Sequence, residues 1–189
     1  MVSIEPYGTN IEEIFYFSVE KQFSKADKTE IVNGCKKFFP PDFFVTGQDF
    51  KQLVLAPYSE LKRVYEFIKQ DENPMLQECF PMNVNGKRKI KEKYKKYCET
   101  FSKVTQTIAG DKKVNVRIVH AAKITVCPYC NRDYINSRSK VSVGAQLDHF
   151  YPKSLYPFFA LSLYNLVPIC GTCNLVKRVN KNFCFAFRQ

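Results

Sequence analysis

The 189-residue sequence lacks tryptophan, has only two histidines, and contains no internal repeat or low-complexity segment. It also lacks any apolar run near the roughly 20 residues that a membrane-spanning helix needs. Its first residues, MVSIEPYGTNIEE, carry acids where a secretory leader carries lysine or arginine before an apolar stretch. Hydrophobic residues make up 45% of the chain, which is incompatible with global disorder. We therefore expect a soluble, cytoplasmic protein with a packed core.

Negative charge is scarce in the C-terminal part. Residues 1–80 hold nine basic and 13 acidic residues, a net charge of −4. Residues 81–189 hold 20 basic and five acidic residues, a net charge of +15. A surface of this sign favours a partner rich in phosphates, namely nucleic acid. A solvated basic face without a partner is the alternative.

The hydrophobic spacing predicts helices in the first part of the chain, over residues 10–24, 27–39, 58–70 and 87–104. Residues 72–86 hold two prolines and are expected to form a loop. From residue 114 the chain is rich in Val, Ile, Thr and Tyr, which predicts short strands and hairpins up to residue 150. A loop with helical turns is expected over 151–168, then a short helix from near Cys173. The predicted class is α+β, with a helical region over 1–113 and a second domain over 114–189.

Eight cysteines are present, and four of them form two CxxC pairs, Cys127/Cys130 and Cys170/Cys173, separated by 39 residues. A disulfide framework needs a secretory context, which the sequence does not indicate. Two CxxC pairs can supply four thiolates to one tetrahedral zinc. Zinc would stabilise a module of about 75 residues, which buries little apolar surface by itself. The alternative is a set of buried or redox-active thiols.

The residues between and after these pairs follow an ordered pattern. CPYCNRDYI is followed by QLDHFYPKSLYPFFALSLYNLVPICGTCN and then by Lys177. Over about residues 124–180 this pattern resembles the HNH nuclease family, which has the ββα-metal fold. It is most similar to the zinc-stapled branch of that family. Within that branch we compare it with the HNH subunit that accompanies an ATPase in Septu-type and retron-linked antiphage defence.

The resemblance assigns roles to four residues. His149 matches the general base, Asn165 the middle asparagine that orients the His149 strand, and Asn174 the final position, where the family name would place histidine. Asp148 and Asn174 would hold a catalytic divalent cation. Because both offer oxygen ligands, Mg²⁺ or Mn²⁺ is expected there. The zinc bound by four thiolates has no open position, so it is expected to be structural.

Each of these residues also has an ordinary structural alternative. Asp148 and His149 can form a buried orienting pair or a surface ion pair, Asn174 can cap a helix, and Asn165 can sit in a turn. His120, outside the pattern, is expected to be a structural histidine. Four basic residues flank the expected site and are candidates for phosphate contacts: Arg132, Lys153, Lys177 and Arg178.

Two functions follow from these expectations. The first is a metal-dependent endonuclease acting on DNA, working with a protein partner such as an ATPase subunit that docks on the helical region. The second is a non-enzymatic zinc module that binds nucleic acid or a protein. The pair Asp148–His149 together with Asn174 favours the first, because a binding module does not require these residues.

Overall fold

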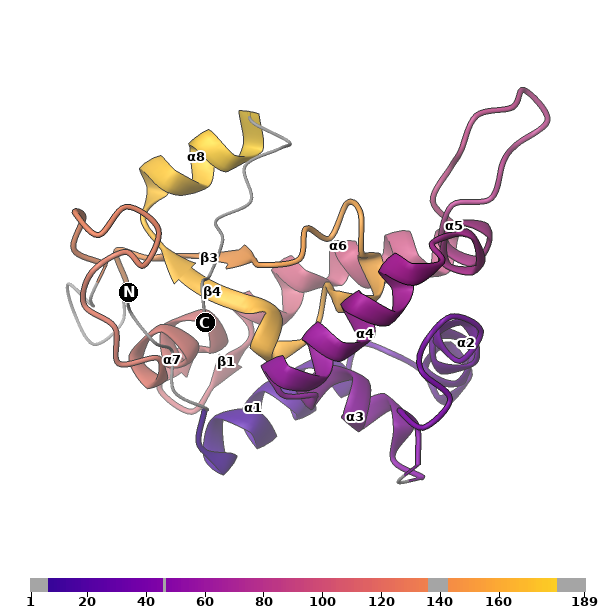
Figure 1. Ribbon diagram of the computed structural model, residues 1–189. Coiled ribbons are helices and arrows are strands. Elements are labelled where there is room, and N and C mark those ends of the chain that lie inside the picture. The colour runs from indigo at the N-terminus through magenta and orange to yellow at the C-terminus, as the bar shows by residue number, and fades with distance from the viewer. Residues whose placement is uncertain (1–6, 46, 136–142, 180–189) are drawn as a thin grey trace.

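The computed structural model describes residues 7–45, 47–135 and 143–179, with the side chains of Arg178 and Val179 excluded. Within these ranges the chain is mostly helical, with eight α-helices and two small two-stranded sheets (Figure 1). The coarse expectation of a mixed, mainly helical fold is therefore confirmed. None of the described helices is long and apolar enough to cross a lipid bilayer.

Six helices precede residue 107. They are α1 (Thr9–Glu20), α2 (Lys25–Cys35), α3 (Asp49–Leu55), α4 (Tyr58–Gln70), α5 (Asn73–Cys79) and α6 (Glu92–Gln106). A small sheet of β1 (Ile108–Ala109) and β2 (Lys112–Lys113) follows and leads into α7 (Val114–Ala121). The remaining elements are β3 (Gln146–His149), the 3₁₀ turns η1 (Pro157–Phe159) and η2 (Leu163–Asn165), β4 (Leu166–Ile169) and α8 (Gly171–Val179).

The last three regular elements form a ββα unit. β3 pairs antiparallel with β4, with Asp148 opposite Val167 and His149 opposite Leu166. The chain then passes directly from β4 into α8, which contacts β3. β3 therefore lies between a partner strand on one edge and a helix across one face.

The start of α2 and the existence of α5 have causes that periodicity alone does not reveal. α2 begins at Lys25 rather than Asp27, because Ser24 and Asp27 form a capping box: Asp27 N–H donates to Ser24 Oγ at 3.1 Å, and Ser24 N–H donates to Asp27 at 3.0 Å. The expectation of a loop over 72–86 is wrong for residues 73–79, which form α5. Pro74 lies in its first turn, where a missing N–H has no cost.

The strand expected over residues 114–121 is also wrong, because this segment is helix α7. Its valines and isoleucine have high strand propensity, but Val114, Ile118 and Ala122 follow helical spacing and are buried. α7 packs against α1 and α6, and this tertiary contact outweighs local propensity. His120 therefore lies in the last turn of a helix, not in a strand.

The helical region and the ββα unit share one continuous hydrophobic core. Ser162 donates to the carbonyl of Leu53 at 3.0 Å, and the Tyr7 hydroxyl donates to the carbonyl of Leu166 at 3.3 Å. A cluster of phenylalanines joins the loop after α2 to η1, with Phe38 and Phe158 ring centroids 5.0 Å apart. The domain boundary at residue 113 stays a prediction. Each of these contacts joins a residue before it to a residue after it.

A buried carboxylate organises much of the positive charge in the helical region. Glu78 is 4% exposed, and the ammonium groups of Lys37, Lys91 and Lys93 lie 2.8, 3.1 and 2.8 Å from its oxygens. Burial raises the pKa of Glu78, but the hydrogen bonds from the lysines outweigh it and bring the value down to about 2. The ammonium groups of these three lysines are therefore paired with a carboxylate of the protein itself.

We predict that Glu78→Gln lowers the free energy of unfolding by about 2 kcal/mol at pH 7, because it leaves ammonium groups without their buried counter-charge. The folded-state pKa lies below that of an unfolded glutamate. The contribution is thus present above about pH 4.5 and is lost as the pH falls towards 2. Urea unfolding at pH 7 and at pH 3 measures both effects. Glu13→Gln, at an exposed position, is the control, and equal stability of the two variants at pH 7 would contradict the prediction.

Candidate metal centre and adjacent polar site

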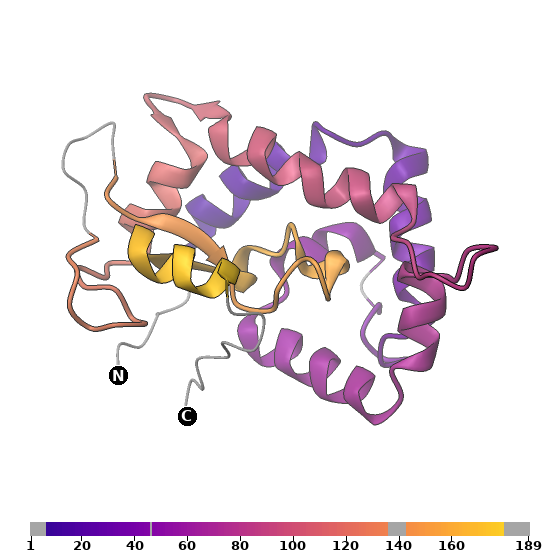
Figure 2. The same cartoon turned by 90° about the horizontal axis from the view of Figure 1, so that it is seen from above.

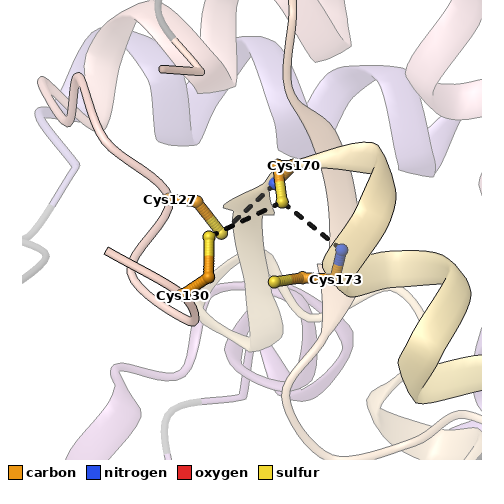
Figure 3. A group of neighbouring side chains, drawn as sticks. All are labelled: Cys127, Cys130, Cys170 and Cys173. Carbon is orange, nitrogen blue, oxygen red and sulfur yellow. Dashed lines mark hydrogen bonds between the residues drawn. The ribbon is translucent and has the colours of Figure 1, made fainter. Parts of the chain in front are cut away.

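Four cysteines from two distant segments meet at one point. The sulfurs of Cys127, Cys130, Cys170 and Cys173 all lie within 4.8 Å of one another, as Figure 3 shows. The Sγ atoms of Cys130 and Cys170 are 3.9 Å apart. A tetrahedron with Zn–S bonds of about 2.3 Å has edges of about 3.8 Å, so this spacing suits a zinc ion. The cluster could hold such a metal, as the spacing of the two CxxC pairs predicts.

Local backbone structure places both pairs. Cys127 and Cys130 flank a turn closed by a bridge between Val126 and Tyr134, and the Asn131 N–H donates to the Cys127 carbonyl at 2.9 Å. The second pair lies at the start of α8, where free N–H groups point towards the sulfurs. The N–H of Cys170 donates to the sulfur of Cys127 at 3.3 Å, and the N–H of Cys173 donates to the sulfur of Cys170 at 3.3 Å.

The thiols of this cluster differ in how easily they ionise. Burial raises the pKa of Cys170 to about 12, and it also raises the pKa of Cys173. These two thiols are therefore protonated at neutral pH unless a metal replaces their protons. Burial also acts to raise the pKa of Cys130, but hydrogen bonds from the backbone of Asp133 and Arg132 outweigh it and lower the value to about 7. Zinc binding here would release protons and would be tighter at higher pH.

A polar site lies beside this cluster, between β3 and α8. Lys177 donates from its ammonium to Asp148 Oδ2 at 2.5 Å and to the His149 carbonyl at 2.7 Å. One turn earlier on α8, Asn174 Nδ2 donates to Gln146 Oε1 at 2.5 Å. Gln146 and Asp148 are two residues apart on β3, so they share the face that α8 covers. Asp148 and Asn174 are therefore both part of the β3–α8 interface.

His149 is the last residue of β3 and is buried, with 8% of its surface exposed. Its Nε2 lies 2.9 Å from the carbonyl oxygen of Ala160, which can only accept, so Nε2 carries the proton and donates. The ring centroid of Phe101, on α6, lies 4.5 Å from that of the imidazole. Burial lowers the pKa of His149 to about 4, so the ring is neutral at pH 7 and its Nδ1 has an unprotonated lone pair.

Asn165 is completely buried and holds the chain that follows β3. Its Oδ1 accepts from the Tyr151 N–H at 2.7 Å, and its Nδ2 donates to the carbonyls of Tyr151 and Phe159 at 3.1 and 3.0 Å. Its backbone carbonyl also accepts from the Phe150 N–H at 2.8 Å. These bonds join the end of β3 to the start of β4 and fix the path of the chain that follows His149.

Tyr129 belongs to the site, although the sequence analysis does not identify it. Its hydroxyl donates to Asp148 Oδ2 at 2.8 Å, and the Lys177 ammonium lies 5.7 Å from its ring centroid. Tyr129 stands between the two cysteines of the CPYC pair, which is the one signal in the sequence that could have pointed to it. Tyr129 therefore joins the CPYC turn, which carries two of the cysteines, to the carboxylate.

The four basic residues expected to contact phosphates lie in different surroundings. Lys177 is paired with Asp148, and Lys153 donates to the Cys98 carbonyl at 3.4 Å above the ring of Phe101. Arg132 is exposed beside the CPYC turn. The side chain of Arg178 lies outside the described part of the structure.

No protein-family model, no curated protein and no solved structure matches the chain.

We predict that the purified protein carries zinc and that Cys127→Ser loses it, since three thiolates and a hydroxyl no longer complete the sulfur tetrahedron. Metal analysis by mass spectrometry and thermal unfolding measure the loss of zinc and of stability. Cys98→Ser is the matched control, because Cys98 lies on α6 outside the sulfur cluster. A Cys127→Ser protein that keeps its full zinc content would show that the four sulfurs are not the metal site.

Proposed function

We propose that the protein is a metal-dependent endonuclease of the HNH type, which hydrolyses phosphodiester bonds in DNA. One observation carries the proposal. A strand ending in Asp148 and His149 pairs with β4 and is covered by a helix bearing Asn174 and Lys177, beside a cluster of four cysteines. This arrangement puts an acid, an imidazole and an amide on adjoining elements of one small unit.

The donor set fits a hard divalent cation. Asp148 and Asn174 offer oxygen atoms, and Asp148 already binds a positive group, the ammonium of Lys177, at 2.5 Å. In the proposed enzyme these two residues would hold Mg²⁺ or Mn²⁺. The ion would neutralise charge on the scissile phosphate and stabilise the leaving oxygen.

His149 is suited to accept a proton from the attacking water. Its Nε2–H is held by the carbonyl of Ala160, so the tautomer and the ring orientation are fixed. The ring is neutral at pH 7, as a general base must be. Asn165 supports this role by fixing the chain that directly follows His149.

Lys177 has a second possible use when DNA and a metal ion are bound. A cation at Asp148 would compete with its ammonium, which could then turn to a phosphate oxygen while staying on the same helix face. Arg132 and Lys153 would add positive charge beside the site. We further propose that the nuclease acts with a partner such as an ATPase subunit in antiphage defence, following the resemblance in the motif.

A specific observation also favours the second candidate, a non-enzymatic zinc module. Asp148 is closed by Tyr129 and Lys177, and His149 is buried under Phe101, as in a purely structural polar cluster. Such a module would bind nucleic acid or protein without cleaving it. The following measurement separates the two functions.

We predict that His149→Ala lowers Mg²⁺-dependent nicking of supercoiled plasmid by about 10²–10⁴-fold, because the general base is removed. His120→Ala is the matched control: it removes the chain's other imidazole, on α7, and should leave the rate unchanged. Zinc content and circular dichroism of both variants check that they fold. If His149→Ala, folded and zinc-loaded, nicks as fast as the wild type, the nuclease proposal fails.

We also predict that Tyr129→Phe lowers nicking about 10-fold and raises the Mg²⁺ concentration needed for half-maximal rate, with zinc content unchanged. The missing hydroxyl removes one hydrogen bond that orients Asp148, which corresponds to about 1.4 kcal/mol. Tyr134→Phe is the control, since Tyr134 is 77% exposed near the same turn. A Tyr129→Phe enzyme with the wild-type rate and Mg²⁺ dependence would show that the hydroxyl does not position the carboxylate.

A further inference from the structure

A hairpin projects from the helical region between α5 and α6 (Figure 1). It covers residues 81–90, and a bridge pairs Met82 with Arg88. The N–H of Asn83 donates to the carbonyl of Lys87 at 2.8 Å, and the Lys89 N–H donates to the Pro81 carbonyl at 3.1 Å. At the tip, Asn83 Oδ1 accepts from two backbone N–H groups, and Gly86 supplies the positive φ that the turn requires. The hairpin is therefore a defined structure and not an irregular loop.

The hairpin carries positive charge that no carboxylate in the described part of the chain neutralises. Seven basic residues lie between positions 87 and 96. The four in or beside α6 each have a carboxylate within 4 Å: Lys91 and Lys93 at Glu78, Lys95 at Glu92, and Lys96 at Asp27. The three on the hairpin, Lys87, Arg88 and Lys89, are exposed and have no such carboxylate among the described residues. The four basic residues in or beside α6 are thus paired within the protein, and the unpaired positive charge of this segment lies on the hairpin.

Two large apolar side chains lie on the same projection. Met82 is 66% exposed and Val84, near the tip, is 101% exposed. Exposed apolar groups combined with Lys and Arg are a common feature of elements that lie in a nucleic-acid groove, where apolar atoms meet sugars and bases while cations meet phosphates.

The hairpin faces the same side of the molecule as the candidate site. In Figure 1 it rises on one side and α8 on the other, with β3 and the segment that follows it between them. Figure 2, from above, shows the same order along the molecule: α8, then the segment after β3, then the hairpin. A nucleic acid bound at the β3–α8 site could extend towards the hairpin along this face.

We propose that the hairpin 81–90 is a nucleic-acid contact, which binds the phosphate backbone of a DNA duplex away from the bond that is cut. The inference builds on the proposed nuclease function, since it assigns a second part of the substrate surface. Lys87 and Lys89 bind phosphates. Arg88 donates to the Phe80 carbonyl at 3.0 Å and also fastens the base of the hairpin.

The test compares two double variants of the full chain, Lys87→Gln/Lys89→Gln and Lys21→Gln/Lys25→Gln. Both remove two exposed lysines, and the first keeps Arg88, so the hairpin's own hydrogen bonds remain. Binding to a fluorescein-labelled DNA duplex of about 30 base pairs is measured by anisotropy at several NaCl concentrations, with no Mg²⁺ or Mn²⁺ added, so that the duplex is not cleaved and the zinc is not chelated. We expect the hairpin variant to lose about 5–10-fold in affinity, and its slope of log K against log salt to fall in magnitude by about 1.5. The control variant should change little.

Equal losses of DNA affinity in the two variants would mean that only the net charge of the protein matters. An unchanged affinity of the hairpin variant would mean that the hairpin does not bind DNA and instead suits an acidic protein partner. Either result overturns the inference, as does a wild-type protein that does not bind the duplex. The nuclease proposal is judged separately, by plasmid nicking with His149→Ala. The hairpin variant could lose DNA affinity while the wild type and His149→Ala nick plasmid at the same rate. That result would support the hairpin contact and contradict the nuclease proposal.

Discussion

The arrangement of the candidate site depends on the meeting of four sulfur atoms. Cys127 and Cys130 lie on a turn far from β4 in sequence, and their sulfurs meet those of Cys170 and Cys173. The sulfur of Cys127 accepts the N–H of Cys170, so the turn is fixed against the first residue before α8. Because α8 in turn covers β3, the position of the sulfur cluster determines which side chains face Asp148.

The sulfur cluster also influences the carboxylate of Asp148, through Tyr129. Tyr129 lies within the CPYC turn, so its hydroxyl can reach Asp148 only when both cysteines of that turn are in place. A metal among the sulfurs would stabilise the turn and, through Tyr129, the carboxylate. A cation that never touches substrate can therefore still influence the chemistry, by restricting the carboxylate to one orientation.

The sequence predicts those parts of the protein that local chemistry determines. The sulfur cluster follows from two CxxC pairs, because that spacing suits one metal whatever fold surrounds it. The helix α4, expected over 58–70, is found over the same residues because its apolar stripe is strong. In contrast, α7 could not be predicted from its valines and isoleucine, because its burial against α1 and α6 is decided by distant parts of the chain. The bond from Tyr129 to Asp148 spans 19 residues and needs the register of β3 against β4, which no local pattern contains.

The helical region also determines the state of the proposed base. Phe101 of α6 covers the His149 ring, and burial is the main reason that the pKa is about 4, with smaller contributions from the charges of Lys153 and Lys177. A base with so low a pKa is neutral at pH 7 but accepts a proton weakly. A DNA phosphate beside Lys153 and Lys177 would offset their charges, but burial, the main cause, would still keep the pKa of the imidazole below its usual value. In the proposed enzyme the cover from α6 would therefore set how strongly His149 accepts a proton, and an isolated β3–β4–α8 unit without α6 would lack this cover.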